Sequence, residues 1–289
     1  MISESPAWAA LEQHATDNNF DLKTLLNDPV RTDAMFASLG ESIHCDFSRQ
    51  LMDQKTMAAM TDLAVTAELR VKIERMFSGE KVNETENRPA YHIALRAASP
   101  PAEVLQIQQR IKSFSERIRS EGKLTEVLCI GIGGSYLGPE FIFESLRTLY
   151  PQATRKLRFL ANVDPIDVAR ALEGLDASKL LVIIISKTFT TAETMLNART
   201  VRKYLIDSVG AQATENQMCA VSADLEKTRD FGISDENVFA FWDWVGGRFS
   251  GSSAVGLLPL SIHFGWDVCE QFLSGARTVD EHFLQEKNL

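Results

Sequence analysis

The sequence predicts an α/β fold, an αβα sandwich in which helices cover both faces of a five-stranded parallel sheet, with a helical N-terminal segment before it. Two observations support this prediction. From about residue 124, short apolar runs alternate with helical patterns, which is typical of βαβ units and a parallel sheet. Before residue 120, apolar residues recur at helical spacing. We therefore expect a helical segment at 1–120 that packs on the sandwich, and the sandwich with trailing helices at 121–289.

The N-terminal segment contains two clear helical patterns. The apolar positions of the first are Leu51, Met52, Met57, Met60, Leu63 and Ala64. The second pattern follows Pro100-Pro101, and its apolar positions are Val104, Leu105, Ile107, Ile111, Phe114 and Ile118. Residues 80–90 are polar and show no periodicity, so we expect an ordered loop between helices there.

Five short apolar runs are the predicted strands, at 126–130, 157–161, 180–185, 217–221 and 238–242. The predicted helices between and after them lie at 139–149, 165–175, 191–208 and 223–231, and the chain is helical again from residue 252. The run at 180–185 is apolar at every position, as in a strand buried on both faces of a parallel sheet. Ligands of such folds bind beyond the carboxyl ends of the strands, so a site is expected in the loops that follow them.

Composition narrows the class of protein. The chain has 289 residues, of which 45% are hydrophobic and 24% charged, as in a soluble globular protein with a sizeable core. A net charge of −9 argues against a broad nucleic-acid surface. No apolar stretch reaches the ~18 residues that cross a bilayer, and the N-terminus lacks a basic segment followed by an apolar one. We expect a cytoplasmic protein that binds neither membranes nor nucleic acid.

The cysteines and histidines predict no metal site. Cys45, Cys129, Cys219 and Cys269 are far apart in sequence and form no C-x-x-C pair, which indicates reduced thiols. The five histidines show no spacing typical of metal ligands. We expect neither a metal nor any other cofactor.

The loop at 186–191 is the strongest functional signal. Its sequence, Ser186-Lys187-Thr188-Phe189-Thr190-Thr191, follows the apolar strand and precedes a helix. Hydroxyls, one ammonium group and free backbone amides at a helix N-terminus favour an anion, and a phosphate fits best. The G-x-x-x-x-G-K-[ST] pattern is missing, so we do not expect ATP or Mg²⁺. The alternative is a Ser/Thr-rich helix cap without a ligand.

A glycine-rich loop follows the first predicted strand. Residues 131–139 read Gly-Ile-Gly-Gly-Ser-Tyr-Leu-Gly-Pro, and Pro139 suits the first turn of the next helix. Glycines allow the backbone to approach a ligand closely. The pattern G-x-G-x-x-G would require glycine at 136, where Tyr136 stands, which disfavours a dinucleotide. A tight turn without a ligand is the other alternative.

The third loop, at 243–250, reads Asp-Trp-Val-Gly-Gly-Arg-Phe-Ser and follows the last predicted strand. Its Arg248 could stabilise negative charge on a reacting oxygen, or could form a structural ion pair. Glu193 falls in the first turn of the helix after the 186–191 loop, where a carboxylate complements the helix dipole. It could instead hold an active-site histidine or, less favourably, serve as a general base.

At these residues the chain resembles the glucose-6-phosphate isomerase (phosphoglucose isomerase) family. The similar blocks, in the expected order, are the three loops at 131–139, 186–194 and 243–250. The polar segment at 79–88 and the sequence His92-x-Ala94-Leu95-Arg96 resemble the family's N-terminal block. Together these blocks span about residues 35–289.

The resemblance implies a sugar-isomerase (SIS) fold, usually in a homodimer, and a metal-free interconversion of glucose 6-phosphate and fructose 6-phosphate through a cis-enediolate. The residues that it implies for the sugar phosphate are Gly134, Ser135, Ser186, Lys187, Thr188 and Thr191. Arg248, with Gly247 beside it, would stabilise the enediolate. Glu193 would orient the histidine that assists ring opening.

The family is roughly twice as long as this chain, and its enediol base, ring-opening histidine and late lysine lie in the half that follows. Glu270, Glu281, His263 and His282 sit in ordinary helical patterns and do not replace them. We therefore expect the first SIS subdomain without the second, and no substantial turnover by this chain alone. The alternatives from other classes are a non-catalytic phosphosugar-binding SIS module and a nucleotide-dependent oxidoreductase, which Tyr136 disfavours.

Overall fold

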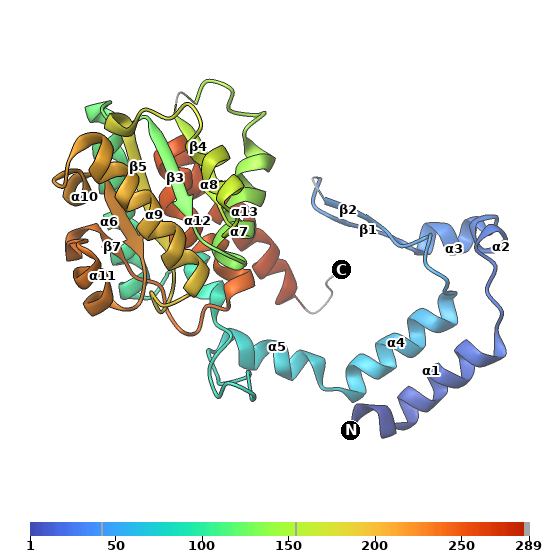
Figure 1. Cartoon of the computed structure of the whole chain (residues 1–289). Coiled ribbons are helices and arrows are strands. Elements are labelled where there is room, and N and C mark those ends of the chain that lie inside the picture. The colour runs from blue at the N-terminus through green and yellow to red at the C-terminus, as the bar shows by residue number, and fades with distance from the viewer. Residues whose placement is uncertain (42, 154, 286–289) are drawn as a thin grey trace. The chain divides into compact units, whose positions relative to one another are not determined.

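A computed structural model describes residues 1–41, 43–153 and 155–285 (Figure 1). The chain divides into two compact units, one formed by Met1–Pro89 with the chain from Thr278, the other by Ala90–Arg277. The boundary therefore lies near residue 89 and not at the predicted 120. Helix α6 (Ala102–Glu121) belongs to the second unit because its apolar stripe, including Val104, Ile111 and Ile118, is buried in that unit's core. The expected packing of the N-terminal segment on the sandwich stays a prediction.

The first unit is mostly helical, as predicted. Its α-helices are α1 (Pro6–Asp17), α2 (Leu22–Leu26), α3 (Pro29–Ala34), α4 (Gln54–Thr66) and α5 (Leu69–Phe77), and the short 3₁₀ helix η1 (Ile2–Glu4) precedes them. The first four α-helices begin at Ser5, Asp21, Asp28 and Asp53, whose side chains accept hydrogen bonds from backbone amides of the first turn. Such caps satisfy amides that have no partner within the helix.

The first unit also contains a hairpin that the sequence analysis did not predict. Strands β1 (Phe36–Leu39) and β2 (Ile43–Asp46) pair in antiparallel fashion, and Gly40 takes a positive φ of 58° at the turn. The loop after the hairpin is held by Arg31, which is 2% exposed. Its guanidinium donates to the carbonyls of Leu25, Ser48, Gln50 and Met52 at 2.7–3.2 Å.

The second unit contains the predicted five-stranded parallel sheet, in the order β4-β3-β5-β6-β7. The strands are β3 (Glu126–Ile130), β4 (Lys156–Leu160), β5 (Leu180–Ile185), β6 (Met218–Val221) and β7 (Val238–Phe239). Strands β3 and β5 have the predicted bounds, and every residue of both is buried. Strand β7 ends three residues before the prediction, because its partner β6 ends at Val221, opposite Phe239.

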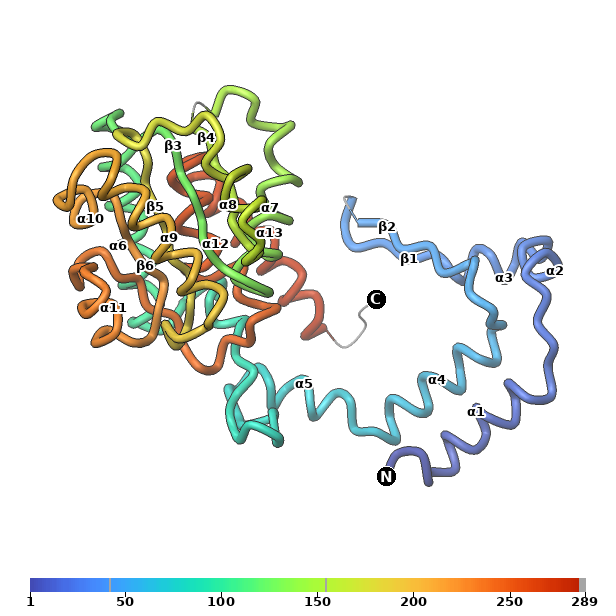
Figure 2. Tube along the Cα trace, viewed as in Figure 1, coloured from blue at the N-terminus to red at the C-terminus, as the bar shows by residue number. Residues whose placement is uncertain are grey.

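Helices cover both faces of the sheet (Figures 1 and 2). On one face the core includes side chains of α6, α7 (Gly134–Leu146), α12 (Ala254–Phe264) and α13 (Trp266–Phe283). On the other it includes α8 (Pro165–Leu172) and α9 (Ala192–Val209), with α11 (Leu225–Phe231) packed against them. The short helices are α10 (Ala213–Asn216), η2 (His92–Arg96), η3 (Ala177–Lys179), η4 (Asp235–Asn237) and η5 (Gly247–Ser252). This layered arrangement confirms the predicted fold class.

The start of α7 differs from the prediction. The helix begins at Gly134, so Pro139 is not in its first turn but is buried inside it. Gly133 has a φ of 61°, which turns the chain into the helix earlier than the proline suggests. Pro139 has no amide hydrogen, so it cannot donate to the carbonyl four residues before it. No helix in the described part of the chain has the length and apolarity needed to span a bilayer.

Candidate functional site

The three loops singled out in the sequence all follow the carboxyl ends of strands in one sheet. The glycine-rich loop follows β3, the 186–191 loop follows β5 and the 243–250 loop comes soon after β7. Strands β3 and β5 are parallel neighbours, with Ile130 opposite Ile184. The three loops therefore lie along the same edge of the sheet, and contacts join the third loop to each of the other two.

The glycine-rich loop lies directly against the 243–250 loop at Gly134. A Cβ atom on Gly134 would lie 2.1 Å from the carbonyl oxygen of Gly247, so no side chain fits at position 134. The Ser250 hydroxyl donates to the carbonyls of Gly247 at 2.7 Å and of Gly134 at 3.4 Å. These contacts bring the start of helix α7 against η5, whose second residue is Arg248.

The N-terminus of α7 has unused hydrogen-bond donors. In the described residues, the amides of Ile132, Gly133 and Gly134 donate to no backbone carbonyl, and the first such bond is from Ser135 to the carbonyl of Ile132 at 3.2 Å. Ser135 is partly buried. Free amides and the positive end of the helix dipole make this corner suitable for an anion.

The 186–191 loop is anchored to the neighbouring strand. The Ser186 amide donates to the carbonyl of Val221 at 3.1 Å, and the Lys187 carbonyl accepts from the amide of Ala223 at 2.9 Å and from the hydroxyl of Ser222 at 3.2 Å. Phe189 takes a φ of 52°, which is unusual for a residue with a side chain, and its ring is buried. The loop therefore has a defined conformation with the backbone turned sharply at Phe189.

The amides at the end of this loop are also free. Among residues 1–41, 43–153 and 155–285, no backbone carbonyl accepts from the amides of Thr190, Thr191 or Ala192. Thr191 occupies the N-cap position of α9, but its side chain makes no capping bond. The predicted cap is thus incomplete, and this leaves a second helix N-terminus with donors for an anion at the same edge.

The loop hydroxyls form two pairs. Ser186 is 3% exposed, and its hydroxyl donates to that of Thr191 at 3.4 Å. Thr188 and Thr190 are exposed, and their hydroxyls lie 2.7 Å apart. Burial turns the Ser186 side chain toward the loop itself, whereas Thr188 and Thr191 remain accessible.

Lys187 joins the second loop to the third. Its ammonium group lies 2.9 Å from a carboxylate oxygen of Asp243 and 5.5 Å from the ring centre of Phe241. The Lys187 side chain is 25% exposed and that of Asp243 is 81% exposed. Sequence reasoning did not single out Asp243 as a site residue, although it opens the Asp-Trp-Val-Gly-Gly-Arg motif.

Arg248 and Glu193 are both exposed, Arg248 in the first turn of η5 and Glu193 in the first turn of α9. Within the described part of the chain, neither side chain makes an ion pair, so the structure does not join the two predicted catalytic residues by a contact. Gly247, also exposed, precedes Arg248 and is the residue whose carbonyl contacts Gly134.

The segment 91–96 packs against the 243–250 loop. From the sequence, this segment was identified only as part of a block that resembles the family, without a role in the site. The ring of His92 stacks on that of Phe249 with centroids 4.4 Å apart, and the Tyr91 amide donates to the carbonyl of Trp244 at 3.1 Å. The Arg96 guanidinium donates to the hydroxyl of Ser252 at 3.4 Å. The segment 91–96 thus holds the Gly-Gly-Arg turn from outside.

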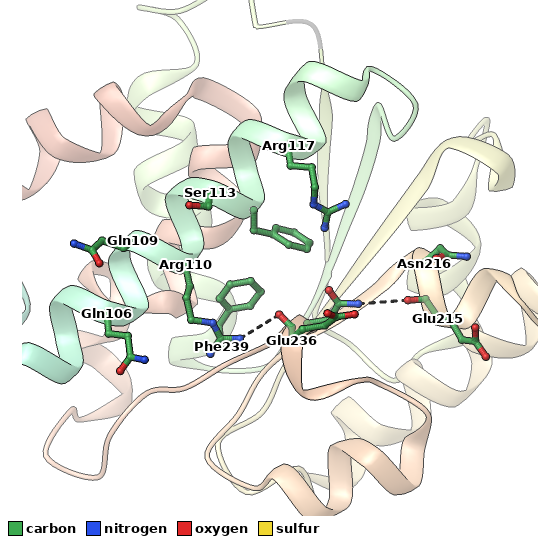
Figure 3. Close-up of a pocket in the computed structure, with 11 residues that line it drawn as sticks. Gln106, Gln109, Arg110, Ser113, Arg117, Glu215, Asn216, Glu236 and Phe239 are labelled. Atoms are coloured by element: carbon green, nitrogen blue, oxygen red, sulfur yellow. Dashed lines mark hydrogen bonds between the residues drawn. The ribbon is translucent and has the colours of Figure 1, made fainter.

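A hollow of about 600 Å³ lies elsewhere (Figure 3). Helix α6 lines one side of it, and the residues just before β6 and at the start of β7 line the other. It therefore opens at the amino ends of the strands, away from the three loops. Arg110 is committed there to the carbonyls of Asp235, Glu236 and Val238. In the described residues, no three His, Cys, Asp or Glu side chains gather as a metal site.

Comparison with known proteins identifies relatives. The family model described as phosphoglucose isomerase matches residues 46–289. The chain is 46% identical to the cytosolic glucose-6-phosphate isomerase of Zea mays and 44% identical to that of Arabidopsis thaliana, and both alignments cover the whole chain. It spans only 55% and 56% of the lengths of these relatives.

A solved structure gives the same result. The crystal structure of a glucose-6-phosphate isomerase from Chlamydia trachomatis matches with a TM-score of 0.84 and 26% sequence identity. The match covers 98% of this chain and 57% of that one.

Proposed function

The chain belongs to the phosphoglucose isomerase family, and we propose that it forms the phosphate-binding part of an aldose–ketose isomerase acting on glucose 6-phosphate and fructose 6-phosphate. One observation carries the proposal: two helix N-termini with unused amides, at Gly133–Gly134 and at Thr190–Thr191, lie at one sheet edge beside Lys187. Amides, an ammonium group and hydroxyls are the donors that a phosphate monoester needs.

We assign the phosphate to the donors at this edge. The residues are Gly134, Ser135, Ser186, Lys187, Thr188 and Thr191. Thr188 and Thr191 are exposed and would contact the phosphate directly, while the buried Ser186 would act by orienting Thr191. On binding, the Lys187 ammonium group would pair with the phosphate in place of Asp243, or would contact both at once. Binding energy from this remote group would position the reacting carbons.

The chemistry is the transfer of a proton between C1 and C2 of the open-chain sugar through a cis-enediolate. Negative charge develops on the sugar oxygens, and we assign Arg248 to stabilise it, since its guanidinium is exposed on a turn that Gly134 and Ser250 fix in place. Gly247 keeps the turn free of a side chain beside this group. Glu193 is assigned to orient the histidine that assists ring opening.

These residues supply donors for the phosphate and for the oxyanion, but we assign none of them as the base that removes the carbon-bound proton. We therefore expect the 289-residue chain by itself to bind 6-phosphosugars with little turnover. In the longer proteins that it resembles, we expect a homodimer, and the cytosolic names of the relatives agree with the predicted location.

Calorimetric titration of the chain with 6-phosphogluconate and with gluconate tests the binding site. The phosphorylated compound should bind and the other should not, because the proposed donors all address the phosphate. Equal binding of the two, or binding of neither, contradicts the proposal. An isomerase assay of the same purified chain tests the expected lack of turnover, and activity close to that of the maize enzyme would contradict that expectation.

A further inference from the structure

A groove between helices α9 and α11, which adjoins the 186–191 loop through Phe189 and Thr190, has the composition of a second ligand site. Two adjoining hollows of about 480 Å³ each share Arg199, Asp230 and Phe231 as lining residues. Each volume lies in the range typical of small-molecule sites. The two helices that form the groove can be followed in Figure 2.

The α9 wall of the groove carries two arginines, Arg199 and Arg202, whose charges are not committed to an ion pair in the described residues. Arg199 and Arg202 are three residues apart, so they lie on one face of the helix. In the described part of the chain, neither makes an ion pair, and the buried Nε of Arg202 has no hydrogen-bond partner. By contrast, the neighbouring Lys203 pairs with Asp207 and Lys227 pairs with Asp224.

Two guanidiniums at this spacing repel each other unless an anion lies between them. Because the whole chain carries a net charge of −9, this local excess is not part of a generally basic surface. A phosphate monoester, which accepts from two guanidiniums at once, is the group that matches them best.

The floor of the groove is apolar and partly aromatic. Phe189 is 4% exposed and Met195 is 5% exposed, and both line the hollow beneath Arg199. Phe231 is partly exposed, its ring centre lies 5.7 Å from that of Phe189, and the Arg202 guanidinium lies 5.6 Å from it. A flat ring placed on Phe231 would cover this apolar surface.

Asp230 completes the groove. Its carboxylate is exposed, lines both hollows and makes no ion pair in the described residues. A carboxylate beside a bound phosphate is unfavourable unless it accepts hydrogen bonds, and neighbouring hydroxyl groups on one sugar can donate them. The groove thus offers partners for a phosphate, a flat ring and a hydroxylated sugar.

From this combination we propose that the α9–α11 groove binds a nucleoside monophosphate. Arg199 and Arg202 take the phosphate, Phe231 stacks with the base, and Asp230 accepts from the ribose hydroxyls. The groove adjoins the proposed sugar-phosphate site at the start of α9, where Phe189, Thr190 and Ala192 line the first hollow. The side chains assigned to the nucleotide, those of Arg199, Arg202 and Phe231 with Asp230, are not among those assigned to the sugar phosphate.

Calorimetric titration of the 289-residue chain with AMP, adenosine and inorganic phosphate tests the proposal. AMP should bind more tightly than either of the other two, because each of them supplies only part of the recognised chemistry. Phosphate binding as tightly as AMP, or no AMP binding, would overturn it. Substitution of both arginines (Arg199→Ala with Arg202→Ala) should weaken AMP binding about ten-fold or more.

Matched variants locate the effect. Arg147→Ala removes an exposed arginine that pairs with Glu144 outside the groove and should leave AMP binding within about two-fold. Phe231→Leu keeps an apolar side chain but removes the aromatic ring. It should weaken the binding of AMP and leave the binding of inorganic phosphate unchanged. Lys187→Ala should leave AMP binding unchanged, and the double arginine variant should leave 6-phosphogluconate binding unchanged. AMP binding that depends on Lys187 and not on the two arginines would overturn the assignment while leaving the sugar-phosphate site intact.

Discussion

Lys187 and Asp243 form an ion pair 2.9 Å long between two loops that are more than fifty residues apart in sequence. The ammonium group that we assign to the phosphate is thus already aligned by the motif that carries Arg248. A ligand phosphate has to compete with the Asp243 carboxylate for this group. The ion pair therefore fixes the position of Lys187, and it also lowers the gain in binding free energy when Lys187 contacts a phosphate.

Lys187→Ala should weaken 6-phosphogluconate binding by about 1–3 kcal/mol, the scale of a charge-assisted hydrogen bond. Asp243→Asn is the matched variant, and it should tighten binding because it removes the competing negative charge. Calorimetric titration measures both. Unchanged affinity in the lysine variant, or loss of affinity in the asparagine variant, would show that Lys187 does not contact the phosphate as assigned.

Thr191→Ala should weaken the binding of 6-phosphogluconate by about 1–3 kcal/mol, because the accessible Thr191 hydroxyl is assigned to donate to the phosphate. The side chain makes no capping bond to helix α9 but accepts from the buried Ser186 hydroxyl at 3.4 Å, so its removal should lower the free energy of unfolding by about 1 kcal/mol. A titration and a urea melt separate the two effects. A drop in stability without a change in affinity would assign Thr191 to the Ser186 contact and not to the ligand.

Gly134→Ala should disrupt the contact between the glycine-rich loop and η5, since the new Cβ would lie 2.1 Å from the Gly247 carbonyl oxygen. We expect a loss of about 2 kcal/mol or more in the free energy of unfolding, together with weaker 6-phosphogluconate binding. Gly138→Ala is the control, because Gly138 lies in the same helix as Gly134. Its new Cβ would lie 3.6 Å from Gly251, an ordinary van der Waals distance. This control should be neutral or stabilising by urea denaturation.

His263 should make stability depend on pH. Burial, with the positive charges of Arg119 and Arg155 nearby, lowers the pKa of His263 to about 4 from 6.5. The unfolded chain therefore binds the proton first as pH falls, so the free energy of unfolding should drop by up to ~3 kcal/mol between pH 6.5 and 4. Above pH 6.5 this contribution is fully present.

His263→Phe should flatten that part of the profile, because the site packs against Phe143 and Phe264 and no longer titrates. Urea melts at pH 4.5 and 6.5 measure the difference. Parallel slopes for the parent and His263→Phe would contradict the prediction.

Arg31→Ala should destabilise the first unit by about 3–5 kcal/mol, because it leaves four buried or partly buried carbonyls without their donor. Arg70→Ala, which removes an exposed pair with Glu74, should cost less than about 1 kcal/mol. Limited proteolysis with mass spectrometry reports on this unit directly. Cleavage rates at residues 40–60 that are equal in the two variants would exclude a structural role for Arg31.

Much of the second unit was predictable because its signals are local. A run such as 180–185 is apolar at every position, and this alone excludes an amphipathic helix and indicates a doubly covered strand. The order of strand, donor-rich loop and helix was also correct for the first and second loops. The hairpin at 36–46 was missed because its strands are short and the main signal in the sequence is a single glycine, Gly40.

The sequence by itself determined the parallel α/β fold, the strand bounds at the centre of the sheet and the loops in which donors gather, because these depend on neighbouring residues and their periodicity. Tertiary structure decided where β7 ends, since its partner β6 ends at Val221 opposite Phe239, and where α7 begins, since that depends on the φ of Gly133. It also decided that Lys187 faces Asp243 and that Gly134 abuts Gly247. Such contacts join residues far apart in the chain, and only folding brings them within reach of each other.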